Sequence, residues 1–199
     1  MDLTGAASLE YSSLIRPCMG ERVSGDAVVL RPLEGGLFAA IIDVLGHGPE
    51  AHELAQVIDT FLDRHATADV FSLMTRLHQR LKGTRGAAVG MCAVDSATGS
   101  INYVGIGNTS LRRFGDSETR LVSYDGVLGQ NMRTPLQQSL KLASGDTLVL
   151  YTDGVSDRFT ASDYPGLVRH APNDVVRNIL DRFGKDHDDS GCIAIRYCE

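Results

Sequence analysis

The sequence predicts an α+β fold, in which antiparallel strands and helices form separate packed layers. Many short apolar or alternating runs are separated by turns that contain glycine, which is typical of antiparallel strands. Two helical patterns come directly after the third of these runs, and one more comes before the last run. This grouping favours sheet layers covered by helices over the regular strand–helix alternation of a parallel sheet.

The first part of the chain predicts three strands and two helices. The loosely alternating run 6–16 predicts an opening strand, and residues 27–32 and 37–44 predict a hairpin. A helix is expected from Pro49, because proline suits the first helical turn, and a second helix is expected over 70–82. Both helices carry apolar residues every three or four positions, which predicts a buried stripe on each.

The second part of the chain is expected to contain mostly strands. A helix is predicted near 173–183, where apolar residues again recur at helical spacing. We expect the strands 137–142 and 146–152 to pair with each other across the glycine-containing turn 143–146. The full set of strands predicted here is 87–95, 101–106, 110–114, 120–123, 137–142, 146–152 and 192–197.

Length and composition are those of one globular domain spanning residues 1–199, with 43% apolar and 22% charged residues. Since there is no run of 18 apolar residues and no apolar leader at the N-terminus, we expect a cytoplasmic protein outside the membrane. The net charge of −6 argues against a general nucleic-acid binder. The four cysteines form no C-x-x-C pair, so we expect reduced thiols and no structural zinc.

The most informative stretch is 43–48, with the sequence Asp-Val-Leu-Gly-His-Gly, between the apolar run 37–42 and a helix. A carboxylate at a strand end beside a glycine-rich turn is well placed to hold a hard cation. The alternative is that Asp43 caps the helix that follows.

Similar acidic sites occur three more times along the chain. Asp153 ends an apolar run and is followed by glycine, Asp188 and Asp189 precede the last strand, and Asp26 precedes the strand 27–30. Four acidic sites at strand ends suggest carboxylates that converge at one rim of a sheet. There they would repel one another unless cations joined them, and all-oxygen ligands favour Mn²⁺ or Mg²⁺ over zinc.

These motifs occur in the order seen in metal-dependent Ser/Thr protein phosphatases of the PPM (PP2C) type, which the sequence resembles. The Asp-Val-x-Gly-His-Gly form is similar to the bacterial SpoIIE/RsbU branch, and the short length is similar to the RsbX type of stressosome feedback phosphatase. The resemblance implies two packed antiparallel sheets flanked by helices on both outer faces. The motifs that carry it are Gly25-Asp26, residues 43–48, Gly107-Asn108, residues 151–154 and Asp188-Asp189.

The resemblance also implies a set of metal ligands. Asp43 would bridge two divalent cations, and Val44 would add its backbone carbonyl. Asp153 and Asp188 would hold one cation, and Asp26 would lie in or just behind this set of ligands. The two cations would be Mn²⁺ or Mg²⁺.

Several roles stay open at this point. Asp189 is the alternative to Asp188 as a ligand, and His47 would either orient water or only support its loop. Arg22 is a candidate for gripping the substrate phosphate, with a solvated surface arginine as the alternative. Asn108 is interpreted as a turn residue that tolerates a left-handed conformation.

The sequence departs from the family at three places: Val44 where many relatives have glycine, Gly191 where they have Thr or Ser, and apolar residues after Asp26. None of these removes a predicted ligand. The expected function is dephosphorylation of phosphoserine or phosphothreonine in signalling proteins, with STAS-domain stressosome scaffold proteins as partners and a monomeric enzyme. A catalytically weak binding module and a small-molecule phosphate hydrolase remain as alternatives.

Overall fold

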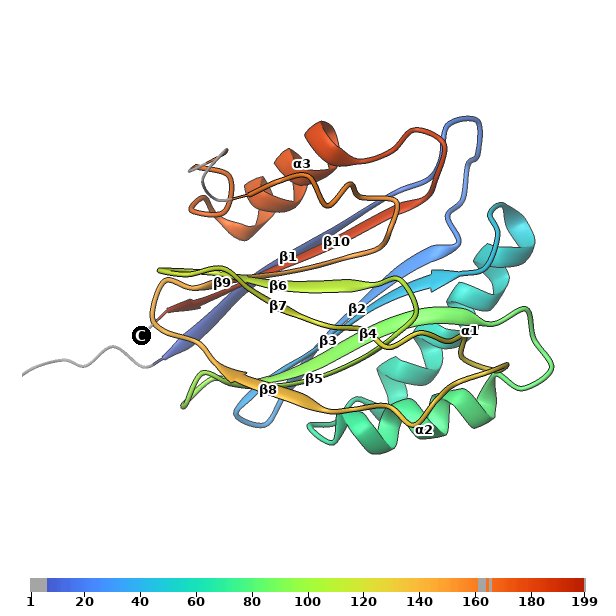
Figure 1. Cartoon of the computed structure of the whole chain (residues 1–199), viewed down its shortest axis with the longest axis horizontal. Coiled ribbons are helices and arrows are strands. Elements are labelled where there is room, and N and C mark those ends of the chain that lie inside the picture. Colours follow the sequence, from blue (N-terminus) through green and yellow to red (C-terminus); the bar gives the residue numbers. More distant parts are fainter. Residues whose placement is uncertain (1–6, 161–163, 165, 199) are drawn as a thin grey trace, which may run out of the picture.

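Two antiparallel sheets pack face to face and carry helices on both outer faces (Figure 1). The computed structural model describes residues 7–160, 164 and 166–198, and within these ranges each sheet has five strands and there are three helices. This confirms the α+β class and the sandwich that the family resemblance implies.

One sheet has the strand order β2-β3-β4-β5-β8. Its strands span Asp26–Leu33 (β2), Gly36–Val44 (β3), Ala87–Asp95 (β4), Ser100–Ile106 (β5) and Gln138–Lys141 (β8). The outer face of this sheet is covered by two helices, α1 (Pro49–His65) and α2 (Val70–Arg80). The apolar stripes predicted for these helices are buried there, for example Ile58 and Leu77.

The other sheet has the order β1-β10-β9-β6-β7. Its strands span Ser8–Arg16 (β1), Ser190–Cys198 (β10), Thr147–Tyr151 (β9), Ser110–Phe114 (β6) and Thr119–Leu121 (β7). Helix α3 (Pro172–Phe183) packs on its outer face through residues such as Val176 and Ile179. Side chains from the inner faces of both sheets, including Ile41, Leu150 and Ile193, form the core between them.

The predicted pairing of 137–142 with 146–152 is wrong, because the two strands lie in different sheets. Strand β8 is partly exposed along its length and adds to the edge of β5. All five residues of β9 are buried, and it lies between β10 and β6. A strand whose side chains are apolar on both faces suits the middle of a sheet, where a neighbouring strand pairs along each of its edges. A half-polar strand suits the edge of a sheet.

Two further expectations concern the cysteines and membranes. The cysteines Cys18, Cys92, Cys192 and Cys198 are all free thiols, as expected. In the part of the chain that the structure describes, no helix combines the length and apolar character needed to cross a bilayer.

Candidate functional site

The two sheets bring their acidic residues together at one end of the sandwich. Asp26 begins β2 and Asp43 lies near the end of β3, directly opposite it in the antiparallel register, so both side chains are on the same face. Asp153 lies two residues beyond β9 and Asp188 two residues before β10, at the neighbouring end of the other sheet. The sandwich therefore gathers carboxylates that are far apart in the sequence.

The pKa of Asp43 reflects the nearby carboxylates. Burial, followed by the charges of Asp153 and Asp188, raises the pKa of Asp43 to about 7 from its ordinary 3.8. A hydrogen bond from the Asn108 side chain opposes this rise. Burial and the charge of Asp153 likewise raise the pKa of Asp188. These half-buried carboxylates repel one another, and a bound cation would relieve the repulsion.

Asp26 lies behind this group and joins the two sheets. It is buried, and its Oδ2 accepts a hydrogen bond of 2.6 Å from the hydroxyl of Thr152. The same hydroxyl accepts a 2.9 Å hydrogen bond from the backbone N–H of Gly191. Burial and the charge of Asp43 raise the pKa of Asp26 well above its usual range. Thr152 therefore holds the carboxylate of Asp26 in place beside Asp43; it lies inside the motif 151–154, but this role was not evident from the sequence.

The structure separates the roles of the adjacent residues Asp188 and Asp189. Asp189 is buried, and its two carboxylate oxygens accept hydrogen bonds from the backbone N–H groups of Cys18, at 2.8 Å, and Gly25, at 2.7 Å. It thereby holds the loop before β2 against the start of β10. Asp188 is half-buried and interacts with the charges of Asp153 and Lys185. This arrangement favours Asp188 as the ligand of the pair.

Substitution of Asp189 and substitution of Asp188 should therefore affect different properties of the protein. Asp189→Asn replaces an acceptor of two backbone N–H groups by an amide, and we expect the melting temperature of the metal-free protein to fall by roughly 3–12 °C. Asp188→Asn should leave that temperature nearly unchanged but reduce the stabilisation gained on adding Mn²⁺. Thermal melts of both variants with and without Mn²⁺ test this, and the reverse pattern would make Asp189 the ligand.

The turn at 43–48 does not use Asp43 as a helix cap, so the capping alternative is wrong. The N-cap of α1 is Gly48, with no side-chain capping hydrogen bond. Gly46 and Gly48 have φ of 85° and 78°, a left-handed conformation that favours glycine. His47 is exposed, and its Nδ1 lies 3.2 Å from Glu21 Oε1, so it supports the contact between its loop and the loop before β2.

Other predicted residues lie as follows. Val44 is buried and its N–H donates to the carbonyl of Gly25, which ties the end of β3 to the start of β2. Arg22 is exposed in the loop before β2. Asn108 lies in the turn between β5 and β6, as expected, but the left-handed residue of this turn is Gly107, with φ of 92°, and the Asn108 side chain reaches Asp43.

The donor set suits a hard divalent cation. Asp43, Asp153 and Asp188 supply only carboxylate oxygens, and their mutual repulsion is of the kind that such a cation neutralises. Within the described ranges, no three acidic, histidine or cysteine side chains already converge tightly enough to enclose one ion. Backbone carbonyls and water, which complete most magnesium sites, would therefore supply the remaining ligands.

Known proteins share this sequence pattern and this fold. The family model described as Stage II sporulation protein E (SpoIIE) matches residues 34–197. The phosphoserine phosphatase RsbX of Bacillus subtilis (strain 168) is 23% identical over 139 residues, which cover 69% of this chain and 70% of RsbX.

Solved structures match nearly the whole chain, among them the following two. One, described as the bacterial stressosome, a modular system adapted to control secondary messenger signalling, has a TM-score of 0.87 and 27% identity, over 95% of this chain and 100% of that one. The other, RsbX in complex with magnesium, has a TM-score of 0.83 and 19% identity, over 95% of each chain. Since the family match runs from the turn before β3 into β10, the chain belongs to the SpoIIE family of PP2C-type domains.

Proposed function

We propose that residues 1–199 form one metal-dependent phosphatase domain that hydrolyses phosphoserine and phosphothreonine in signalling proteins. The observation that carries the proposal is the convergence of Asp43, Asp153 and Asp188 from two sheets, with carboxylates that repel one another. Asp43, Asp153, Asp188 and the backbone carbonyl of Val44 would hold two divalent cations, Mg²⁺ or Mn²⁺. The magnesium in the RsbX structure supports the choice of a divalent cation.

When bound, such a pair of cations would lower the pKa of a shared water and neutralise charge on the phosphoryl oxygens. The chain's own residues hold the ligands in place. Asn108 donates to the carboxylate of Asp43, which fixes its orientation, and the Thr152 hydroxyl holds Asp26 behind it. Because Asp26 is buried and hydrogen-bonded to Thr152, we assign it a positioning role rather than direct contact with substrate.

The substrates proposed are STAS-domain scaffold proteins of a stressosome. Two relatives support this class: one is named a phosphoserine phosphatase, and a solved neighbour comes from a bacterial stressosome. Hydrolysis by a water molecule needs no cysteine nucleophile. This agrees with the sequence, which contains no Cys-x₅-Arg loop.

We expect purified protein with Mn²⁺ to remove phosphate from a phosphorylated STAS-domain scaffold protein and from phosphoserine peptides, but not from a matched phosphotyrosine peptide. Intact-mass spectrometry over a time course measures the loss of phosphate from each. The matched peptides share every residue except the phosphorylated one. A scaffold that keeps its phosphate while the phosphotyrosine peptide is cleaved would refute the proposed substrate class.

A further inference from the structure

A cavity of about 510 Å³ opens beside the acidic end of the sandwich. It lies between β6, the end of β9, the loop that follows β9 and the loop that precedes β10. Asn108 and Asp153 line it, and the same two residues belong to the candidate metal site. The cavity and the acidic site are therefore continuous.

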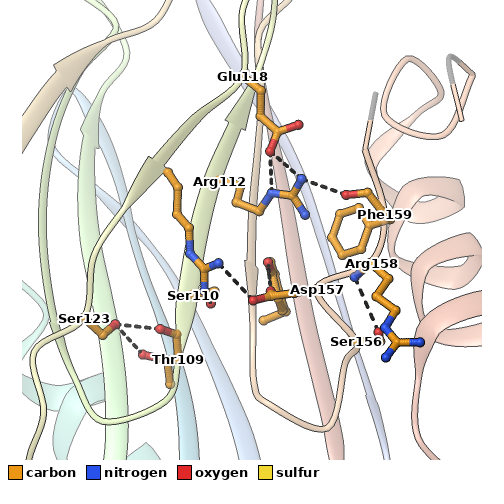
Figure 2. A network of polar contacts seen from close by, with 11 residues as sticks. Thr109, Ser110, Arg112, Glu118, Ser123, Ser156, Asp157, Arg158 and Phe159 are labelled. Atoms are coloured by element: carbon orange, nitrogen blue, oxygen red, sulfur yellow. Dashed lines mark hydrogen bonds and ion pairs between the residues drawn. The ribbon is translucent and has the colours of Figure 1, made fainter. Parts of the chain in front are cut away.

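One wall of this cavity is fixed by a hydrogen-bonded network around Asp157. The Tyr151 hydroxyl donates to Asp157 Oδ1, and Arg120 forms an ion pair with Asp157 Oδ2 at 2.9 Å. The Arg120 guanidinium also donates to the hydroxyl of Ser110 at 2.8 Å. In Figure 2, Asp157 lies near Ser110, on the same segment as Arg158. The guanidinium of Arg120 is thus held in place while its side chain stays 51% exposed.

The loop after β9 is anchored from the other side by a buried arginine (Figure 2). Arg112 donates to the carbonyl of Phe159 at 2.7 Å, lies 4.4 Å from the centre of the Phe159 ring, and is neutralised by Glu118. These contacts fix the end of the segment that carries Asp157 and Arg158. The cavity is therefore largely formed before any ligand binds, as binding sites usually are.

The charges that line the cavity are mainly positive away from the acidic site. Arg120, Arg158 and Lys185 face two carboxylates, Asp153 and Asp157, and Asp157 is already paired with Arg120. Arg158 is exposed, and its backbone N–H donates to the hydroxyl of Ser156 (Figure 2). The Lys185 ammonium donates a hydrogen bond to the backbone carbonyl of Asp153, so Lys185 lies where the cavity meets the acidic site.

We propose that this cavity binds the segment that flanks the phosphorylated residue, and that Arg120 and Arg158 select an acidic side chain in that segment. The inference rests on the proposed phosphatase function and specifies which phosphoproteins the site accepts. Lys185 lies beside Asp153 of the candidate metal site, where its charge would attract the phosphate of the substrate. Arg158 presents its exposed guanidinium to solvent and can bind a carboxylate through paired N–H donors, whereas Arg120, half-exposed and already paired with Asp157, adds positive charge beside it.

Three phosphoserine peptides test the proposal, identical except that the residues flanking the phosphoserine are acidic, neutral or basic. We expect kcat/KM of the wild-type protein to be at least about fivefold higher for the acidic peptide than for the neutral one, and the preference to shrink in about 1 M salt. Arg158→Ala should abolish most of this preference, and Arg158→Glu should reverse it in favour of the basic peptide. The matched control is Arg177→Glu, an arginine on α3 that is also exposed and does not line the cavity.

Binding of the same peptides, labelled with a fluorophore, to the Asp43→Asn variant gives a second measurement by anisotropy. Equal kcat/KM for all three peptides, unaltered by Arg158→Glu, would overturn the cavity assignment and leave the phosphatase proposal standing. Binding that prefers the acidic peptide, without hydrolysis by the wild-type protein, would overturn the phosphatase proposal and keep the cavity assignment. A preference that Arg177→Glu reverses as fully as Arg158→Glu would reduce the effect to net charge and overturn the cavity assignment.

Discussion

Replacing Asp43 or Asp153 by Asn is expected to lower the rate of phosphoserine hydrolysis by at least about two orders of magnitude, the scale seen when one electrostatic contributor to a transition state is removed. Both substitutions keep the size of the side chain and remove one negative charge. If the carboxylates hold cations, the loss of one negative charge weakens the binding of those cations and leaves the peptide-binding cavity intact. Rates measured on phosphoserine peptides with saturating Mn²⁺ give the size of the effect.

The same substitution at Asp43 should stabilise the metal-free fold at alkaline pH. Burial and neighbouring charges raise its pKa to about 7 from 3.8, so between these values the folded state binds a proton that the unfolded state has released. The wild-type protein therefore loses stability as pH rises through this window, and Asn does not. We expect a gain of at least about 1 kcal/mol for Asp43→Asn at pH 8, and little change near pH 4.

Thermal or urea unfolding of the metal-free proteins at both pH values tests this sign. Asp116→Asn, an exposed carboxylate in the turn after β6, is the matched control and should change neither rate nor stability. The stabilisation gained on adding Mn²⁺ should shrink for Asp43→Asn, because a ligand stabilises a fold only as far as it binds it. An Asp43→Asn protein that is destabilised yet fully active would overturn the assignment of the metal site.

Removal of divalent cations is expected to abolish turnover completely. Without the cations, no positive charge at the acidic end neutralises the phosphate, and the negative carboxylates repel it. Dialysis against EDTA followed by assay on phosphoserine peptides should give no product, and Mn²⁺ or Mg²⁺ should restore the rate. Zn²⁺ should restore it poorly, since the ligands are all oxygen.

A melting curve controls for unfolding during chelation. We expect the EDTA-treated protein to stay folded with a lower melting temperature, and to recover that temperature when Mn²⁺ is added. Full turnover in excess chelator would contradict a reaction that depends on two cations. Loss of activity together with irreversible unfolding would instead assign the cations a structural role.

The sequence by itself determined most secondary structure, because periodicity is a local property. The alternation of residues 6–16 and the three-to-four spacing in α1 and α2 specify which side of each element is apolar, and that side is buried wherever the element packs. The placement of Asp43 and Asp153 at strand ends also followed from local pattern. The turn at Gly46 and Gly48 was also predictable from local sequence, because a positive φ strongly favours glycine.

Only the tertiary structure decided which distant groups meet. The turn at 143–146 was visible, but the separation of β8 and β9 into different sheets depends on β5, β6 and β10, which compete for them as partners. Asp188 and Asp189 are equivalent in sequence, and they differ because the backbone N–H groups of Cys18 and Gly25 reach only Asp189.

The cavity beside Asp153 shows the same limit. Arg120, Arg158 and Lys185 lie on three separate segments, and no local pattern distinguishes them from other surface cations. Hydrogen bonding and charge act through space, whereas periodicity acts along the chain. The sequence therefore determined the elements and the carboxylates at their ends, and the packing of two sheets decided which of those carboxylates and cations share one site.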